Sequence, residues 1–204
     1  MNLSQLYRLH ALLLILFCGI SCTAQTSNTD SAREYLVRRV LKNLAIDGKL
    51  DQAWDAASWS PPFVDIEGSR KSAPSLTTRI RMLYDDQFLY VFAEMEEPDL
   101  SASLTARDAI IFRDNDFEVF LDPNNDQQEY FEYEINALGT VMDLFMPMPY
   151  KKGGKADLSW DSPGLQSAVF LDGTLNKNSD TDKGWTVELA IPFKDMERPG
   201  RVNK

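Results

Sequence analysis

Hydrophobic and polar residues alternate with a period of two along much of the chain, the spacing of a β-strand with one buried and one solvated side. Residues 78–84 alternate in this way, and a mostly apolar run at 88–95 follows the turn-forming segment Asp85-Asp86-Gln87. The two runs predict a β-hairpin. After residue 24, no long segment has the 3.6-residue period of an amphipathic helix.

The same pattern predicts further short strands at residues 117–121, 131–135, 140–145, 165–171 and 185–191. Polar turn residues separate them, and residues 150–160, with two adjacent glycines and three lysines, predict a long loop. At least seven short strands joined by turns are typical of an all-β protein. We therefore expect an antiparallel β-sandwich of jelly-roll or immunoglobulin-like type.

A tight corner precedes these strands, in the run Ile46-Asp47-Gly48-Lys49-Leu50-Asp51-Gln52-Ala53-Trp54. Asp-Gly favours a turn because glycine accepts a positive φ and the carboxylate can bond its own backbone. A short helical turn anchored by Trp54 is expected to follow. We expect Trp54, and Trp185 in the last strand, to be core residues whose truncation to alanine costs about 3–5 kcal/mol.

This corner resembles the opening I-D-G-x-L-D-x-x-W of carbohydrate-binding modules of family 9. Further stretches follow in the order that this family requires, namely LYDDQFLYV, DNDFEVFLD, EIN and GWTVELAIP at residues 83–91, 114–122, 134–136 and 184–192. The resemblance covers residues 46–193. It implies a β-sandwich that binds carbohydrate without catalysing a reaction, in extracytoplasmic polysaccharide breakdown.

The first 24 residues are expected to be an export signal, with Arg8 in a positive start, an apolar stretch at 11–17 and small residues after it. One interpretation places cleavage after Ala24. In the other, Ile20-Ser21-Cys22 is a bacterial lipobox and Cys22 carries the lipid, although Gly19 stands where that motif prefers leucine or valine. Either route predicts an extracytoplasmic protein, which is secreted, periplasmic or an outer-membrane lipoprotein of a bacterium.

Downstream of this segment, the small polar residues 25–33 predict a flexible tether, and residues 34–204 are expected to form one domain. The chain stops about ten residues after the last predicted strand. Modules of family 9 continue through further strands, so the resemblance implies that C-terminal strands are missing.

Composition excludes several kinds of chemistry. The single histidine, His10, and both cysteines, Cys18 and Cys22, lie within the first 24 residues. The rest of the chain therefore lacks the groups for Ser–His or Cys–His catalysis and for zinc, copper or haem ligation by these residues. The net charge of −10 argues against nucleic acid and anionic lipid and suits a neutral partner or a cation. We expect membrane contact only through a lipid at Cys22.

Sugar-binding sites set an aromatic ring against the apolar face of a pyranose and surround it with hydrogen-bonding groups. The resemblance assigns the ring to Phe112, where the family has a tryptophan, and a contact with sugar hydroxyls to Glu118. The family's binding arginine falls at Glu134, which replaces a donor by an acceptor. The alternatives are that Phe112 caps the hydrophobic run 109–111 and that Glu118 is an ordinary solvated residue.

A second stacking tryptophan of the family falls beyond residue 204. Trp160 or Trp59 could supply that second wall from a loop. The alternative for each is to pack down on a sheet.

Any metal must be bound by oxygen ligands, and related modules of the family carry structural calcium. The candidate ligands are Asp114, Asp116, Asp122 and Asp126, for which the alternative role is turn formation. Residues 178–182 begin like an EF-hand loop but lack its glycine and its closing glutamate, so we do not place calcium there.

We therefore expect a module that binds neutral oligo- or polysaccharides. A structural or protein-interaction sandwich that has lost the sugar site is the alternative. A glycoside hydrolase component is more remote, because no pair among the 31 acidic residues stands out as a catalytic acid and base. Convergence of Phe112, Glu118 and a loop tryptophan on one concave surface would distinguish the first two.

Overall fold

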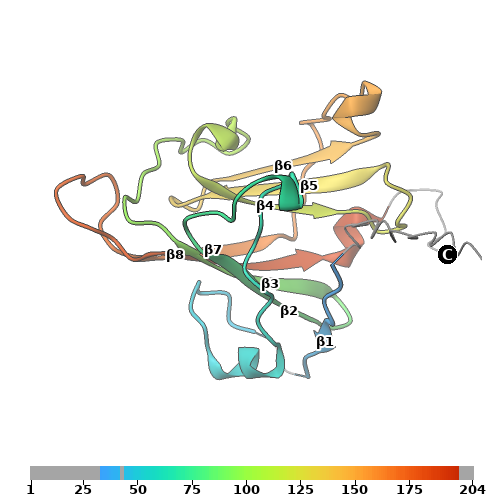
Figure 1. The fold of residues 1–204 in the computed structure, drawn as a ribbon. Coiled ribbons are helices and arrows are strands. Elements are labelled where there is room, and N and C mark those ends of the chain that lie inside the picture. Colours follow the sequence, from blue (N-terminus) through green and yellow to red (C-terminus); the bar gives the residue numbers. More distant parts are fainter. Residues whose placement is uncertain (1–32, 42–43, 198–204) are drawn as a thin grey trace, which may run out of the picture. The chain divides into compact units, whose positions relative to one another are not determined.

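A computed structural model describes residues 33–41 and 44–197 of the 204-residue chain. Its strands form two sheets that pack against each other (Figure 1). One sheet has five strands in the order β1-β2-β3-β8-β7, and the other has the order β4-β5-β6. The bounds are β1 (Arg38–Arg39), β2 (Thr78–Tyr84), β3 (Phe88–Glu96), β4 (Asp116–Leu121), β5 (Tyr130–Asn136), β6 (Val141–Met146), β7 (Gln166–Asp172) and β8 (Gly184–Pro192).

The predicted β-sandwich is confirmed, and β2 to β8 each end within one residue of the strand predicted from the sequence. Short 3-10 helices lie in the connections, at η1 (Gln52–Ala56), η2 (Gly68–Arg70), η3 (Ile111–Arg113), η4 (Tyr150–Lys152) and η5 (Phe193–Met196). None of the helices in the described part of the chain is long and apolar enough to cross a membrane.

Strand β1 departs from the purely antiparallel expectation. Arg38 and Arg39 pair in parallel with Leu83 and Tyr84 of β2. Two residues are too few for an alternating pattern, so no hydrophobic periodicity marks this strand in the sequence.

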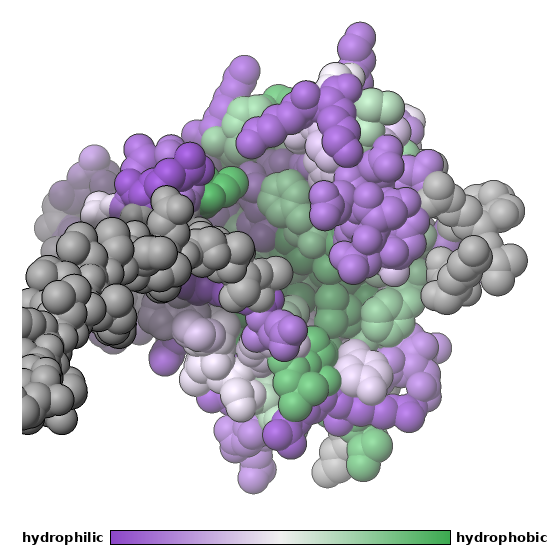
Figure 2. Space-filling view, turned by 45° about the vertical axis from the view of Figure 1, so that its right-hand side comes forward, coloured by the Kyte–Doolittle hydropathy of each residue, from purple (hydrophilic) through white to green (hydrophobic). Residues whose placement is uncertain are grey.

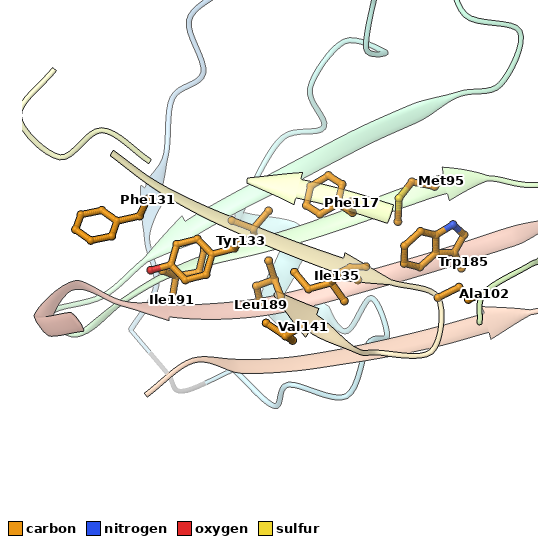
Figure 3. Close-up of a cluster of buried hydrophobic side chains, with 14 of the residues drawn as sticks. Met95, Ala102, Phe117, Phe131, Tyr133, Ile135, Val141, Trp185, Leu189 and Ile191 are labelled. Carbon is orange, nitrogen blue, oxygen red and sulfur yellow. The ribbon is translucent and has the colours of Figure 1, made fainter. Parts of the chain in front are cut away.

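The main core lies between the two sheets. Phe117 of β4 and Tyr133 and Ile135 of β5 extend from the smaller sheet towards Leu189 of β8 (Figure 3). Trp185 of β8 joins this core with 4% of its surface exposed, so its predicted burial is confirmed. Figure 2 shows that some apolar surface reaches the outside of the molecule as a band between hydrophilic regions.

The corner at residues 46–54 closes a second core on the outer face of the five-stranded sheet. Trp54 is completely buried there, as predicted, and packs against Phe92 with ring centroids 5.6 Å apart. Its indole N–H donates to Glu188 Oε1 of β8 at 2.9 Å. The backbone N–H groups of Asp47 and Gly48 donate to Glu188 Oε2 at 2.9 and 3.0 Å. Glu188 therefore holds the whole corner against the sheet.

Gly48 is required at this corner for two reasons. Its φ is +77°, which side chains rarely adopt, and a Cβ atom would lie 2.8 Å from the backbone carbonyl carbon of Val169. The corner consequently lies directly on β7.

Candidate functional site

The outer face of the three-stranded sheet carries a row of acidic side chains. Strand pairing sets Glu118 of β4 directly opposite Glu134 of β5. Asp116 and Glu132 lie on the same face, two residues away along their strands, because side chains alternate between the faces of a sheet. Since like charges directly opposite each other destabilise a sheet, strand pairing does not explain this arrangement.

Loops cover the side of this face formed by β6. Ile111 of η3 is fully buried and packs against three side chains of β6, Met142, Leu144 and Met146. The acidic residues of β5 lie beside this cover, so Glu132 and Glu134 are only 3% and 4% exposed. Glu118, on the edge strand β4, is exposed. The row thus opens to solvent along β4.

Asp114 fixes the loop that follows η3. Its carboxylate accepts hydrogen bonds from the backbone N–H groups of Ser103 and Leu104, both at 2.8 Å, and from Asn136 Nδ2 at 2.9 Å. Desolvation acts to raise the pKa of Asp114, but these hydrogen bonds outweigh it and hold that pKa below its usual value. These three hydrogen bonds, which we call the Asp114 latch, tie residues 103–114 to the end of β5.

Phe112 is presented to solvent by this arrangement. Its neighbour Ile111 is buried in the apolar cover, whereas Phe112 is 61% exposed. The backbone N–H of Phe112 donates a hydrogen bond to the Glu134 carboxyl, which acts to lower the pKa of Glu134. The loop backbone therefore lies beside the acidic row. The structure therefore brings two of the predicted site residues, Phe112 and Glu118, to the same face of the sheet.

Three of the acidic side chains form a compact group. One carboxylate oxygen of each of Asp116, Glu118 and Glu134 lies within 4.8 Å of the others. Asp116 Oδ2 and Glu134 Oε2 are buried and have no hydrogen-bond partner. Within residues 33–41 and 44–197, no lysine or arginine forms an ion pair with any of the three.

This crowding changes how the carboxyls titrate. Burial, followed by repulsion from Glu118, raises the pKa of Asp116 to about 6 and that of Glu134 to about 8. Burial also raises the pKa of Glu118. Anything that reduces the local negative charge or donates hydrogen bonds is therefore favoured at this place.

Exposed aromatic rings flank the acidic row. Besides Phe112, Phe120 of β4 is 54% exposed and Tyr150 of η4 is 55% exposed. The Tyr150 hydroxyl donates a long hydrogen bond to Glu132 Oε2 at 3.5 Å. Aromatic surface beside carboxylate acceptors suits a ligand that has both an apolar face and hydroxyl groups.

The two candidate loop tryptophans do not join this face. The ring centroids of Trp160 and Phe131 are 4.7 Å apart. Phe131 belongs to the core between the sheets, so this contact lies on the opposite side of β5 from Glu134. Trp59 lies on the outer face of the five-stranded sheet, where the guanidinium groups of Arg79 and Arg81 are 4.2 and 4.5 Å from its ring centroid. Both rings therefore pack on a sheet.

The four candidate metal ligands do not form one group. Asp114 forms the latch described above, and only Asp116 belongs to the three-carboxylate group. Asp122 Oδ2 accepts a hydrogen bond from the backbone N–H of Gln127 at 2.7 Å, and Asp126 Oδ1 accepts one from Gln128 at 2.9 Å. These two aspartates shape the turn between β4 and β5.

A groove of about 610 Å³ lies elsewhere, on the outer face of the five-stranded sheet. Its charged side chains already have partners. Arg79 Nε donates to Glu94 Oε2 at 2.7 Å, and the Lys49 ammonium lies 5.1 Å from the centroid of Phe170. None of the residues that line this groove has a buried polar side-chain atom without a partner, unlike Asp116 and Glu134 of the smaller sheet. We therefore place the candidate site on β4 and β5.

A second group of carboxylates, formed by Asp108, Asp143 and Asp161, surrounds an arginine. Arg107 donates to Asp143 Oδ1 at 2.7 Å and pairs with the other two aspartates at 3.8 and 3.3 Å. This group therefore has a positive partner within the protein, unlike the acidic row.

Sequence reasoning did not include Glu132, Phe120 and Tyr150 in the candidate site. Glu132 and Phe120 face each other across β4 and β5, in the row next to Glu118 and Glu134. The alternation of both strands, aligned in register, could have shown that these side chains share a face. Nothing in the sequence places the loop residue Tyr150 there.

Comparison with known proteins supports the fold. The sequence model described as "Carbohydrate family 9 binding domain-like" matches residues 46–203. Exoglucanase XynX of Acetivibrio thermocellus is 28% identical over 151 residues, and endo-1,4-beta-xylanase A of Thermoanaerobacterium saccharolyticum is 29% identical over 151 residues. Each match covers 74% of this chain but only 12% and 11% of those two enzymes. The chain thus spans about an eighth of the length of the curated relatives it matches.

Solved structures of a family 9 carbohydrate-binding module from Caldicellulosiruptor kristjanssonii share the fold at 19% identity. The structure with cellotriose has a TM-score of 0.51 over 80% of this chain and 69% of that chain. The structure with glucose has a TM-score of 0.52 over 80% and 70%. Because the family match covers well over half of its residues, this chain belongs to the carbohydrate family 9 binding domain-like family of carbohydrate-binding, non-catalytic modules.

Proposed function

We propose that this chain binds a neutral oligo- or polysaccharide on the outer face of β4, β5 and β6. One observation carries the proposal: the exposed ring of Phe112 lies on the same face as the carboxylates of Glu118 and Glu134. A pyranose presents an apolar face and a rim of hydroxyl groups, which match these two kinds of surface.

The residues have distinct roles in this proposal. Phe112 provides the stacking surface, and Phe120 and Tyr150 provide further exposed rings around it. Glu118, exposed on the edge strand, accepts hydrogen bonds from sugar hydroxyls. The ligand approaches from the β4 side, because loops cover β6.

The relatives suggest the class of polysaccharide. The curated relatives are named as an exoglucanase and an endo-1,4-beta-xylanase, and the similar module was solved with cellotriose and with glucose. We infer that this chain recognises neutral β-linked glucan or xylan chains and acts as an accessory to their breakdown.

We place the chain outside the cytoplasm, where such polysaccharides occur. The apolar pattern of residues 11–17 supports export, and Cys22 is the proposed lipid attachment site in the lipobox interpretation. Both lie outside the described residues. Expression in a bacterial host tests the anchor: a lipoprotein partitions into the detergent phase, Cys22→Ser releases it, and a soluble chain starting at Gln25 would exclude it.

Calorimetric titration with cellotriose and xylotriose tests the sugar site. We expect weak binding, with a dissociation constant of about 0.1–1 mM, and a loss of about tenfold or more in Phe112→Ala. Phe170→Ala is a matched control, because it removes a ring that is 40% exposed from the groove on the opposite sheet.

Glu118→Gln should also weaken binding without unfolding the protein, because Glu118 is exposed. If Phe170→Ala lowers the affinity and Phe112→Ala does not, the groove is the sugar site. If no neutral saccharide binds at millimolar concentration, the interaction-module interpretation replaces this one.

A further inference from the structure

The group formed by Asp116, Glu118 and Glu134 has the dimensions of a cation site. Two oxygens bound to one Ca²⁺ at about 2.3–2.6 Å can lie at most about 5 Å apart, on opposite sides of the ion. The three carboxylate oxygens lie within 4.8 Å of one another. All three can therefore reach a single ion with little movement.

Glu134 provides an independent indication of a ligand. It is 96% buried, since only 4% of its surface is exposed, and its Oε2 atom has no hydrogen-bond partner among the described residues. The Oδ2 atom of Asp116 is likewise buried and has no hydrogen-bond partner among the described residues. Buried carboxylate oxygens without partners are costly, and in proteins such groups are normally paired or bound to a metal.

The carboxylates at this place also lack a positive partner. Strand register forces Glu118 against Glu134, and no ion pair with lysine or arginine relieves the repulsion in the part of the chain that the structure describes. A bound cation would supply the missing positive charge.

We propose that Asp116, Glu118 and Glu134 bind one Ca²⁺ ion, whose remaining coordination positions are taken by saccharide hydroxyl groups. The first part of this proposal stands on the carboxylate geometry alone. The second part rests on the proposed sugar-binding function.

Calcium fits this site better than magnesium. Ca²⁺ accepts six to eight oxygen ligands in flexible geometry, whereas Mg²⁺ needs a near-ideal octahedron at about 2.0–2.1 Å and loses its water reluctantly. Three carboxylates supply only part of a calcium shell, and the exposed position of Glu118 leaves the solvent side open. Sugar hydroxyls can complete the shell from that side.

The cation is tested on the purified protein after dialysis against EDTA. We expect about 10 mM CaCl₂ to raise the melting temperature by about 3 °C or more, and the same concentration of MgCl₂ to raise it less. Calorimetric titration with CaCl₂ should give one site with a dissociation constant of about 0.1–1 mM. No calcium-dependent shift in the wild-type protein would overturn the proposal.

Variants locate the ion. Glu134→Gln and Asp116→Asn keep the shape of each side chain but remove its charge, so both should abolish the calcium shift while remaining folded in EDTA. Asp126→Asn is the matched control, because Asp126 belongs to the turn beyond β4 and should leave the shift intact. A shift lost in Asp126→Asn but kept in Glu134→Gln would place the ion in the turn and contradict the assignment.

Titration with cellotriose in CaCl₂ and in EDTA tests the link to sugar. We expect the affinity to fall about tenfold or more in EDTA. Equal affinity under both conditions would overturn the calcium link while leaving the proposed sugar binding intact. A calcium shift without any saccharide binding would instead leave the ion assigned and overturn the sugar-binding function.

Discussion

At the scale of single residues, Glu188 ties together distant parts of the chain. It is completely buried on β8, and it accepts hydrogen bonds from the Trp54 indole N–H and from the backbone of Asp47 and Gly48. Trp54 lies 134 positions earlier in the sequence. The Asp-Gly corner and the glutamate of the last strand are therefore parts of one structural contact, remote from the proposed sugar site.

Truncating this residue tests its structural role. Glu188→Ala leaves two buried donors, the Gly48 N–H and the Trp54 indole N–H, and the part-buried Asp47 N–H without an acceptor, and each buried donor costs about 1–3 kcal/mol. We expect the free energy of unfolding, measured by urea denaturation, to fall by about 3 kcal/mol or more. Glu94→Ala, on the same face of the sheet, should cost less than about 1 kcal/mol because its ion pair with Arg79 is exposed. Equal losses in the two variants would contradict this account.

An ion pair with one buried partner gives a second prediction at this scale, because the Asp143 side chain is fully buried whereas that of Arg107 is 46% exposed. Burial raises the pKa of Asp143, and the neighbouring Arg107 acts in the opposite direction. Arg107→Ala removes that compensation and leaves the buried Asp143 carboxylate without its cation, which costs about 1–3 kcal/mol. Because the cost falls on the ionised form, it should be largest near pH 7 and shrink as the pH falls towards 4. Urea denaturation at several pH values measures this loss in the free energy of unfolding. A loss that does not change with pH would contradict the role assigned to Arg107.

At the scale of the elements, the strands follow from the local sequence pattern, whereas the packing of the loops depends on contacts between distant segments. The alternation of residues 78–84 or 117–121 reports directly on one strand, and β2 and β4 follow it. The burial of Glu134 depends instead on a loop that Asp114 fastens to Asn136, some twenty residues away. The packing of Trp160 on Phe131 is likewise a contact between separate segments. Periodicity does not encode such contacts, so the sequence could suggest Phe112 and Glu118 from their strand and its approach, but it left open whether Trp160 and Trp59 line the site or pack on a sheet.

The acidic row makes stability depend on pH. Burial, together with repulsion between neighbours, raises the pKa of Asp116 to about 6 and that of Glu134 to about 8, whereas carboxyls in unfolded chains titrate near 4. A carboxyl whose pKa is higher in the folded state favours folding when protonated. Its contribution is complete below about pH 4 and is lost as the pH rises through 6 to 8.

We therefore expect the melting temperature of the protein in EDTA to fall between pH 5 and pH 9. Carboxyls with lowered pKa, such as Asp85 and Asp114, are already ionised across this window and do not contribute to the change. Glu134→Gln cannot ionise and should flatten the profile, whereas Asp126→Asn should not. A wild-type profile that rises with pH would show that the row is not protonated in the folded protein.

At the scale of the whole molecule, two faces of one sandwich have different chemistry. Beside its groove, the outer face of the five-stranded sheet carries the corner, Trp54 and Trp59, and paired charges such as Arg79 and Glu94. The outer face of the smaller sheet keeps exposed rings and unpartnered carboxylate oxygens, Phe112 and Glu134 among them. The first face is built for stability, and the second leaves groups available for a ligand.

The net charge of −10 sets the kind of ligand that this second face can accept. A neutral saccharide has no charge to screen, so at fixed calcium its affinity should change less than about twofold between about 0.05 and 0.5 M NaCl. A polymer with the same backbone but carrying carboxylate groups is repelled by the acidic protein, so in EDTA it should bind more weakly, and added salt should strengthen it. Affinity electrophoresis in gels containing each polymer measures both effects. Tight binding of the anionic polymer that salt abolishes would show that a basic surface, and not the acidic row beside Phe112, holds the ligand.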